Sequence, residues 1–300
     1  MRIGLLGTGP WARAAYAPAL AGHPGVEFAG VWGRRPEAAT ALAERYDVPA
    51  YDDVDALLAG VDAVAVALPP SVQAEFAVRA ARAGRHLLLD KPLAVSVADG
   101  RAVMAAAERA GVASVVFFTA RFQKEPDAWI EEQAAVAGWF TARAQWLGAV
   151  FTTDSPFAAS PWRREKGALW DVGPHALSVL LPVLGDVRQV VAAAHGPADT
   201  VHLVLDHATG ASSTLTLSLT APPAAAGADV ELRGDAGVAL MPGSSEGAIP
   251  ALSRATDALL TAARTGRPHA CDAAFGLRVT EILATAQARL TDGRDLPPTD

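Results

Sequence analysis

The stretch "IGLLGTGPWA", residues 3–12, decides the fold class that we predict for this chain. A short apolar run enters a turn with two glycines, and Ala12 follows where a helix would begin. This order of strand, glycine turn and helix is typical of a dinucleotide-binding βαβ unit. Gly7 permits the tight turn, Gly9 leaves room for a pyrophosphate, and Ala12 lets the helix lie close to the strand. The alternative is a glycine turn that serves packing alone.

The same rhythm of short strands and alanine-rich helices continues to about residue 120. Further strands are expected at 26–32, 62–68, 86–90 and 114–120, and helices at 11–21, 36–46, 71–84 and 96–111. The strand segments are continuously apolar, which indicates a parallel sheet covered by helices on both faces. We therefore predict a doubly wound Rossmann domain over residues 1–120.

After Phe122 the pattern changes to strand segments separated by turn residues. These segments cover 139–147, 187–195, 200–207, 211–219 and 228–234, and they favour a mainly antiparallel open sheet. Helical segments near 250–264 and 271–290 close the chain. The expected second domain is of the α+β class and spans residues 121–300, with the closing helices within 250–290.

Composition narrows the class of partner. A length of 300 residues is enough for two domains, and 51% hydrophobic residues are ample for their cores. The formal net charge of -7 argues against nucleic acid and anionic lipid as partners and favours a small molecule. The single cysteine, Cys271, cannot form an intramolecular disulfide, and we expect no membrane span, no metal site and a cytoplasmic location.

The end of the second strand indicates which dinucleotide would bind. A carboxylate there would bind the 2′-hydroxyl of NAD, but this chain has Arg34 and Arg35 and no acidic residue before Glu37. A guanidinium can hold a 2′-phosphate through two parallel hydrogen bonds. The preferred cofactor is therefore NADP(H), with NAD(H) as the alternative. Two solvated surface arginines would explain the same sequence.

Two further motifs carry ionisable groups. In "HLLLDKPLA", Lys91 follows Asp90 at the end of a strand, where open α/β sheets bind their ligands and a lysine can donate to a substrate oxygen. In "ALWDVGPHALSVL", a helix beginning near Asp171 would put that carboxylate and His175 on one face, four residues apart. A surface lysine, a helix-capping aspartate and a packed histidine are the alternatives.

Together the motifs "GTGPWA", "DKPLA" and "GALWDVGPHALSVL" resemble the three signatures of the glucose-fructose oxidoreductase, inositol dehydrogenase and rhizopine catabolism (Gfo/Idh/MocA) family. The resemblance implies a nicotinamide-dependent oxidoreductase with catalytic residues Lys91, Asp171 and His175. It also implies a second domain whose open sheet makes subunit contacts, giving a homodimer or homotetramer. The candidate cofactor-binding residues are Gly7, Thr8, Gly9, Trp11, Ala12, Arg34, Arg35, Leu68, Pro69, Gln73, Asp90 and Lys91.

The implied reaction is hydride transfer between the nicotinamide and a carbinol or carbonyl carbon of a sugar, cyclitol or related polyol. In it His175 moves the hydroxyl proton and Lys91 stabilises charge on oxygen. Departures from the family include Gln73, where many members have a histidine beside the nicotinamide, and Ser178, where an acidic residue is common. Candidate substrate contacts are Arg121, Trp162, Arg163 and Trp170. A regulator that binds dinucleotide without turnover is the alternative function.

Overall fold

The computed structural model describes residues 1–152 and 155–292 and divides the chain into two compact units. The first unit contains residues 1–123 and 245–280. The second contains residues 124–244 and the segment from Glu281 onward. The expected boundary near residue 120 is therefore close to the observed one. The assignment of all later residues to the second domain is wrong for 245–280.

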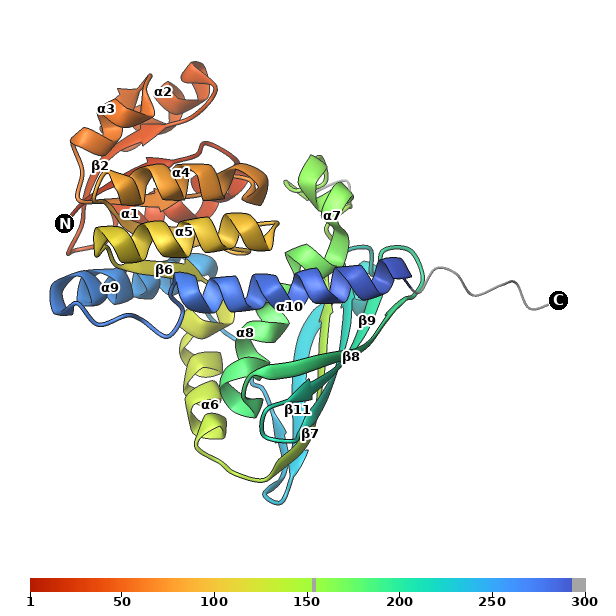
Figure 1. Cartoon of the computed structure of the whole chain (residues 1–300). Coiled ribbons are helices and arrows are strands. Elements are labelled where there is room, and N and C mark those ends of the chain that lie inside the picture. The colour runs from red at the N-terminus through yellow and green to blue at the C-terminus, as the bar shows by residue number, and fades with distance from the viewer. Residues whose placement is uncertain (153–154, 293–300) are drawn as a thin grey trace. The chain divides into compact units, whose positions relative to one another are not determined.

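The first unit is built on a sheet of six parallel strands in the order β3-β2-β1-β4-β5-β6 (Figure 1). Its strands are β1 (Arg2–Leu6), β2 (Glu27–Trp32), β3 (Ala50–Tyr51), β4 (Ala63–Val66), β5 (His86–Asp90) and β6 (Ser114–Phe117). Its helices are η1 (Ala12–Tyr16), α1 (Ala17–Ala21), α2 (Pro36–Glu44), α3 (Val54–Ala59), α4 (Pro70–Arg82), α5 (Val97–Ala110), η2 (Thr119–Phe122), α9 (Ala248–Thr265) and the first part of α10 (Ala273–Asp292). The doubly wound Rossmann fold predicted from the sequence is confirmed.

Local sequence explains where these elements begin and end. Every residue of β4 and β6 is buried, as expected for strands with helices on both faces. The side chain of Ser96 caps α5 by accepting a hydrogen bond from the backbone N–H of Asp99, at 3.1 Å. Gly111 ends the same helix in the left-handed conformation, with φ of 63°. Sequence-local signals of this kind made α5 predictable to within one residue at each end.

Residues 245–280 belong to the first unit because they form part of its core and hydrogen-bond to β6, the strand at the edge of its sheet. The backbone N–H of Val116, in the edge strand β6, donates to the carbonyl of Cys271 at 2.7 Å. Nearby, the N–H of Ala273 donates to the Ser114 hydroxyl at 3.0 Å. Helix α9 contacts α1, β5 and β6. Amphipathic helices are readily predicted from sequence, but which core they cover is a tertiary property, and this accounts for the error.

The second unit has a six-stranded sheet in the order β12-β11-β7-β10-β9-β8 (Figure 1). Its strands are β7 (Trp139–Leu147), β8 (Val187–His195), β9 (Val201–His207), β10 (Ser212–Ser218), β11 (Gly227–Gly234) and β12 (Gly237–Leu240). Its helical elements are α6 (Lys124–Ala134), α7 (Pro161–Asp171), α8 (Gly173–Leu184), η3 (Pro223–Ala225) and the end of α10. Neighbouring strands are antiparallel except for the pair β7 and β10. The predicted α+β class is confirmed.

One face of this sheet is apolar and buried, with Ala144, Leu203 and Leu232 no more than 3% exposed. In β12 the alternate residues point to the other face, where Val238 and Leu240 are exposed by 54% and 64%. Phe140, 76% exposed, lies next to a register shift between β7 and β11. Helix α8 packs against β7 and α6. The chain stretch 161–184 is long and apolar enough to cross a bilayer, but 83% of its apolar window is buried in the protein, as in a core helix.

His207 gives the second unit a predictable pH dependence. The ring is fully buried, with Nδ1 at 3.0 Å from the Gly185 carbonyl and Nε2 at 2.8 Å from the Ser213 hydroxyl. These contacts fit the neutral ring with the proton on Nδ1. Burial lowers the pKa of His207 below its ordinary value and outweighs the hydrogen bond to Gly185 and the nearby aspartates. The unfolded chain therefore takes up this proton first as the pH falls below about 6.5.

We therefore expect the free energy of unfolding to fall with decreasing pH below about 6.5, and less steeply in His207→Gln than in the wild type. The difference in slope is at most about 1.4 kcal/mol per pH unit, the value for one proton. Urea unfolding between pH 5 and 7.5 measures it. His195→Gln, the same substitution at an exposed histidine, is the matched control. Equal slopes for His207→Gln and the wild type would contradict the assignment.

Candidate active site

The glycine turn after β1 has the geometry that the sequence predicts. Gly7 has φ of 130°, a backbone conformation that residues with a Cβ rarely adopt. A Cβ built on Gly7 would also collide with the carbonyl oxygen of Ala67, so both the backbone angle and the lack of space exclude a larger residue. A Cβ built on Gly9 would meet nothing within 4 Å, which leaves the backbone open to an approaching group. Ala12 is fully buried at the start of the π-helical segment η1. The turn can therefore hold a phosphate group near Gly9.

The two arginines after β2 lie beside this turn. Arg34 and Arg35 are both exposed, and neither guanidinium has a hydrogen bond or ion pair to another of the described residues. Gly33, which precedes them, fits tightly against the Thr8 side chain, and a Cβ there would lie 2.6 Å from Thr8 Cγ2. The backbone N–H of Gly7 donates to the Trp32 carbonyl at 2.8 Å. The end of β2 is thus fixed against the glycine turn while its arginines extend into solvent.

Lys91 directly follows the carboxyl end of β5. The glycine turn lies at the same end of the parallel strands, after β1. The Lys91–Pro92 peptide bond is cis, and the lysine backbone N–H donates to Asp90 Oδ1 at 2.8 Å. Gln73, on α4, is only 1% exposed, and its amide bonds to backbone atoms of the 90–93 segment. Leu68 and Pro69 lie at the same edge, between β4 and α4. The structure therefore places these candidate residues in the first unit, and the Gln73 side chain is hydrogen-bonded to the loop that contains Lys91.

Tyr16 is a buried polar residue near this edge that the sequence analysis did not single out. Its ring is fully buried and meets Phe117 edge-on, and its hydroxyl has no hydrogen-bond partner among the described residues. Burial raises the pKa of Tyr16 well above its ordinary value, and the negative charge of Asp90 raises it further. Tyr16 therefore stays protonated at neutral pH. Its sequence signal, one tyrosine in an apolar helix, is that of an ordinary core residue.

Asp171 and His175 belong to the second unit, and the helix boundary between them differs from the prediction. A single helix beginning near Asp171 was expected. Instead α7 ends at Asp171, Val172 makes the junction with φ of -105° and ψ of -18°, and α8 begins at Gly173. Pro174 does lie in the first turn of α8, where its missing N–H costs no hydrogen bond. The two ionisable residues therefore sit on either side of a helix junction.

The carboxylate of Asp171 is paired with Arg163, one of the residues expected to contact substrate. Arg163 Nε lies 2.7 Å from Asp171 Oδ2, and the two side chains are 18% and 6% exposed. The guanidinium also lies over the rings of Phe157 and Trp162, with its carbon 4.6 and 4.7 Å from their centroids. The positive charge of Arg163 is thus compensated within the unit. This geometry argues against the expected role of Arg163 as a substrate contact.

His175 is held by an aromatic residue that the sequence did not reveal. Its ring stacks on Trp146 of β7, with centroids 5.4 Å apart and planes at 11°. Trp170, an expected substrate contact, is instead 3% exposed and donates its indole N–H to Gln287 Oε1 at 3.3 Å. That position argues for a core role. Arg121, in η2 of the first unit, is half-buried, and its charge adds to burial in lowering the pKa of His269.

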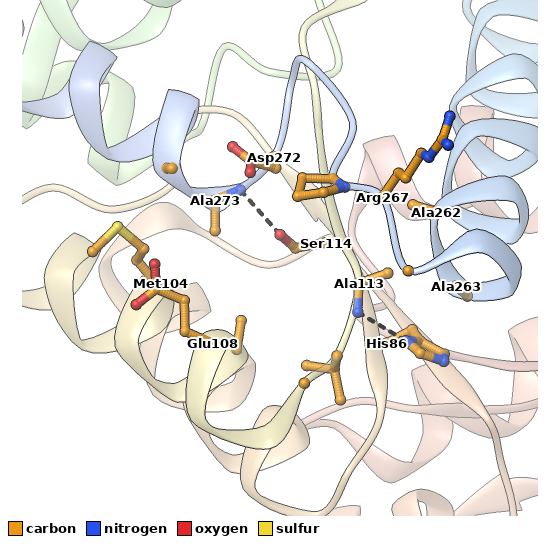
Figure 2. A pocket seen from close by; sticks show the side chains of 16 residues that line it. His86, Met104, Glu108, Ala113, Ser114, Ala262, Ala263, Arg267, Asp272 and Ala273 are labelled. Carbon is orange, nitrogen blue, oxygen red and sulfur yellow. Dashed lines mark hydrogen bonds between the residues drawn. The ribbon is translucent and has the colours of Figure 1, made fainter.

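The first unit contains a cavity of about 270 Å³ near the amino ends of β5 and β6 (Figure 2). These ends are opposite to the carboxyl ends at which the glycine turn and Lys91 lie. His86 Nδ1 accepts from the N–H of Ala113 at 2.9 Å there, and Ser114 accepts from Ala273. Open α/β sheets bind their ligands beyond the carboxyl ends of the strands. The cavity is therefore separate from the edge that carries the glycine turn and Lys91.

Comparison with known proteins agrees with both units. The family described as "Oxidoreductase family, NAD-binding Rossmann fold" matches residues 1–118, and the "GFO/IDH/MocA C-terminal domain" matches residues 141–240. The chain belongs to the Gfo/Idh/MocA family. It is therefore an oxidoreductase with a dinucleotide-binding Rossmann domain, and the resemblance noted in the sequence is confirmed.

Individual Gfo/Idh/MocA relatives act on sugars. D-xylose 1-dehydrogenase (NADP(+)) 2 of Haloferax volcanii is 30% identical over 240 residues, which cover 74% of this chain and 70% of the relative. The dTDP-3,4-didehydro-2,6-dideoxy-alpha-D-glucose 3-reductase of Streptomyces violaceoruber is 30% identical over 63% of this chain, but the match spans only 56% of the reductase. GenD2 from gentamicin A biosynthesis, solved with NAD, has a TM-score of 0.84 at 22% identity, covering 100% of this chain and 97% of GenD2. The last likeness shows the fold alone.

Proposed function

We propose that this Gfo/Idh/MocA protein is an NADP-preferring dehydrogenase or reductase of a sugar, cyclitol or related polyol. The observation that carries the proposal is the position of Lys91. It lies on a loop that Gln73 anchors, at the same end of the parallel strands as the glycine turn. Carboxyl edges of parallel strands are where such folds bind ligands. NADP appears in the name of the xylose dehydrogenase and NAD in that of the GenD2 complex, so the preference rests on this chain's own residues.

The residues present fit a dinucleotide. The open space at Gly9 would admit a pyrophosphate, and the N–H groups at the start of the following helix would donate to it. Thr8, Trp11 and Ala12 belong to the same turn, and Leu68, Pro69 and Asp90 to the adjoining strand ends. Arg34 and Arg35 would bind a 2′-phosphate by charge-assisted hydrogen bonds. A bound nicotinamide would accept or give a hydride at C4.

The proposed catalytic residues then divide the proton chemistry of alcohol oxidation. His175 takes the hydroxyl proton as the hydride leaves the carbinol carbon, and returns it in reduction. Lys91 donates a hydrogen bond to the same oxygen and stabilises the charge that develops there. Asp171, paired with Arg163, is the proposed orienting group of the set. Stacking on Trp146 limits the rotation of the imidazole ring.

Arg34→Glu tests the cofactor preference directly. Loss of a charge-assisted hydrogen bond and gain of a repulsive charge should raise the Kd for NADPH about 10-fold to 100-fold, and that for NADH less than about threefold. Fluorescence titration of the purified protein with each nucleotide measures both constants. The matched control is Arg109→Glu, an equal charge change at an exposed position on α5, which should leave both constants unchanged. Equal weakening of NADPH and NADH by Arg34→Glu would remove the 2′-phosphate argument.

Substrate class is tested by a screen with the better-bound cofactor. D-xylose, myo-inositol and their keto counterparts are the first probes, with turnover followed at the nicotinamide absorbance band. Oxidation or reduction of at least one of these compounds supports the proposed class. Binding of NADPH with turnover of none of a broad set of polyols would favour a regulator that binds the dinucleotide without chemistry.

The open sheet of the second unit is the proposed contact between subunits of a homodimer or homotetramer. Phe140, Val238 and Leu240 are large apolar side chains exposed on β7 and β12, and such residues are favoured at subunit interfaces. The mass in solution, from light scattering after gel filtration, decides the oligomeric state. We also propose a cytoplasmic location, in keeping with a nicotinamide cofactor and a single buried cysteine.

A further inference from the structure

Gln73 is an unusual residue in its surroundings. It lies on α4 with only 1% of its surface exposed, and the buried side of that helix is otherwise formed by alanines and a proline. A buried polar side chain costs free energy unless its hydrogen-bonding groups are satisfied. The question is therefore what the amide of Gln73 bonds to, and why a polar group is placed there.

All the bonds of the Gln73 amide run to one backbone segment. Nε2 donates to the carbonyls of Asp90, Pro92 and Leu93, at 2.7, 3.1 and 3.2 Å. Oε1 accepts from the backbone N–H of Asp90 at 3.0 Å. An amide has two N–H bonds, so one of them is shared between two carbonyls. The side chain thus holds the backbone on both sides of Lys91.

We propose that Gln73 is a positioning residue that fixes the backbone from which Lys91 reaches the reacting oxygen. The inference rests on the proposed function, in which Lys91 is catalytic. A displacement of a catalytic group by about 1 Å can lower a rate about 100-fold, so anchoring both neighbours of a lysine has a direct effect on turnover. This role differs from the expected contact of residue 73 with the nicotinamide, because the amide is already committed to the loop.

Only a group that both donates and accepts can perform this role. Methionine has nearly the same length and volume as glutamine but would leave the N–H of Asp90 and three carbonyls without this partner. Glutamate can donate to a carbonyl only when it is protonated. Gln73→Glu therefore places a titratable replica of the amide in the same site, and the anchor should be partly restored as the pH falls.

The first test measures kcat, KM and the Kd for NADPH in Gln73→Met. We expect kcat to fall about 10-fold to 100-fold, with the Kd for NADPH changed less than about threefold. In Gln73→Glu, the ratio of its kcat to that of the wild type should rise as the pH is lowered. The matched control is Ser114→Ala, which removes another buried side chain that accepts a backbone N–H in the same unit, at the opposite sheet edge. Its kcat should stay within about twofold of the wild type.

A double variant separates this inference from the proposed function. If Gln73 acts through Lys91, Gln73→Met should cause almost no further loss of kcat in a Lys91→Ala background. Full activity of Lys91→Ala would overturn the proposed function itself. Loss of activity in Lys91→Ala, with Gln73→Met resembling Ser114→Ala, would overturn the positioning role alone. Equal losses from Gln73→Met with and without Lys91 would also overturn it, since they indicate a general structural effect.

A further measurement needs no substrate. Deuterium uptake of the peptide covering residues 90–93 should be about tenfold faster in Gln73→Met than in Ser114→Ala, because loss of the anchor lets this segment open locally. Uptake equal in the two variants would contradict the proposal. Gln73→Glu provides the same comparison if the methionine variant does not fold.

Discussion

Lys91→Ala and His175→Ala should each lower kcat about 100-fold to 10,000-fold while the Kd for NADPH stays within about threefold of the wild-type value. In the proposed mechanism each substitution removes a group that acts on the reacting oxygen, and acid–base groups contribute rate factors of this size. The same mechanism assigns neither side chain to the adenosine or the pyrophosphate. Steady-state kinetics on the substrate identified in the screen, combined with NADPH titration, measures both quantities.

Matched controls exist for both variants. Lys124→Ala and His195→Ala remove a lysine and a histidine from exposed positions and should leave kcat unchanged. Unimpaired turnover in both Lys91→Ala and His175→Ala would show the catalytic assignment to be wrong. Parallel loss of turnover and NADPH binding would instead point to a damaged fold.

The two glycines of the turn should respond in opposite ways to the same substitution. Gly7→Ala should lower the free energy of unfolding by about 3 kcal/mol or more, because its φ of 130° is strained for alanine and the methyl would collide with Ala67. Gly9→Ala should change that free energy by less than about 1 kcal/mol. It should nevertheless raise the Kd for NADPH at least about tenfold, since the methyl occupies the space that a pyrophosphate would need. Urea unfolding and nucleotide titration separate the two effects.

Each glycine variant is the control for the other. Normal NADPH binding by Gly9→Ala would mean that the pyrophosphate does not approach this carbon. Normal stability of Gly7→Ala would mean that the close approach to Ala67 relaxes at little cost. The two results are independent, so one can fail while the other stands.

Most of the Rossmann sheet could be predicted from the sequence because its strands leave local signals. The run "HLLLD" is bounded by Gly84 before it and Lys91–Pro92 after it, and it matches β5 residue for residue. Other strands were not predicted. The two residues of β3 are too few to display a periodicity. The four-residue β12 was also not predicted, although β4 and β6 are equally short. Helix α6 carries four acidic residues, which obscured its apolar face.

The candidate site was predictable only in part, for a similar reason. Residue types and spacing indicated Lys91, Asp171 and His175. They did not indicate what holds each of these residues. Asp171 is paired with Arg163 across the non-helical Gly167, and His175 stacks on a strand residue 29 positions earlier, Trp146. Such partners are set by tertiary packing, which a helical spacing rule cannot express.

The return of residues 245–280 to the first unit has a consequence for how the protein is made. The ribosome releases the Rossmann strands early, but the segment that bonds to edge strand β6 through Cys271 is synthesised after the whole second sheet. During synthesis the first unit therefore lacks part of its core, and the edge strand β6 lacks its bonding segment, until more than a hundred further residues have been made. Completion of the dinucleotide-binding unit is in this way tied to synthesis of nearly the entire chain, and a product that stops before α9 lacks part of both units' architecture.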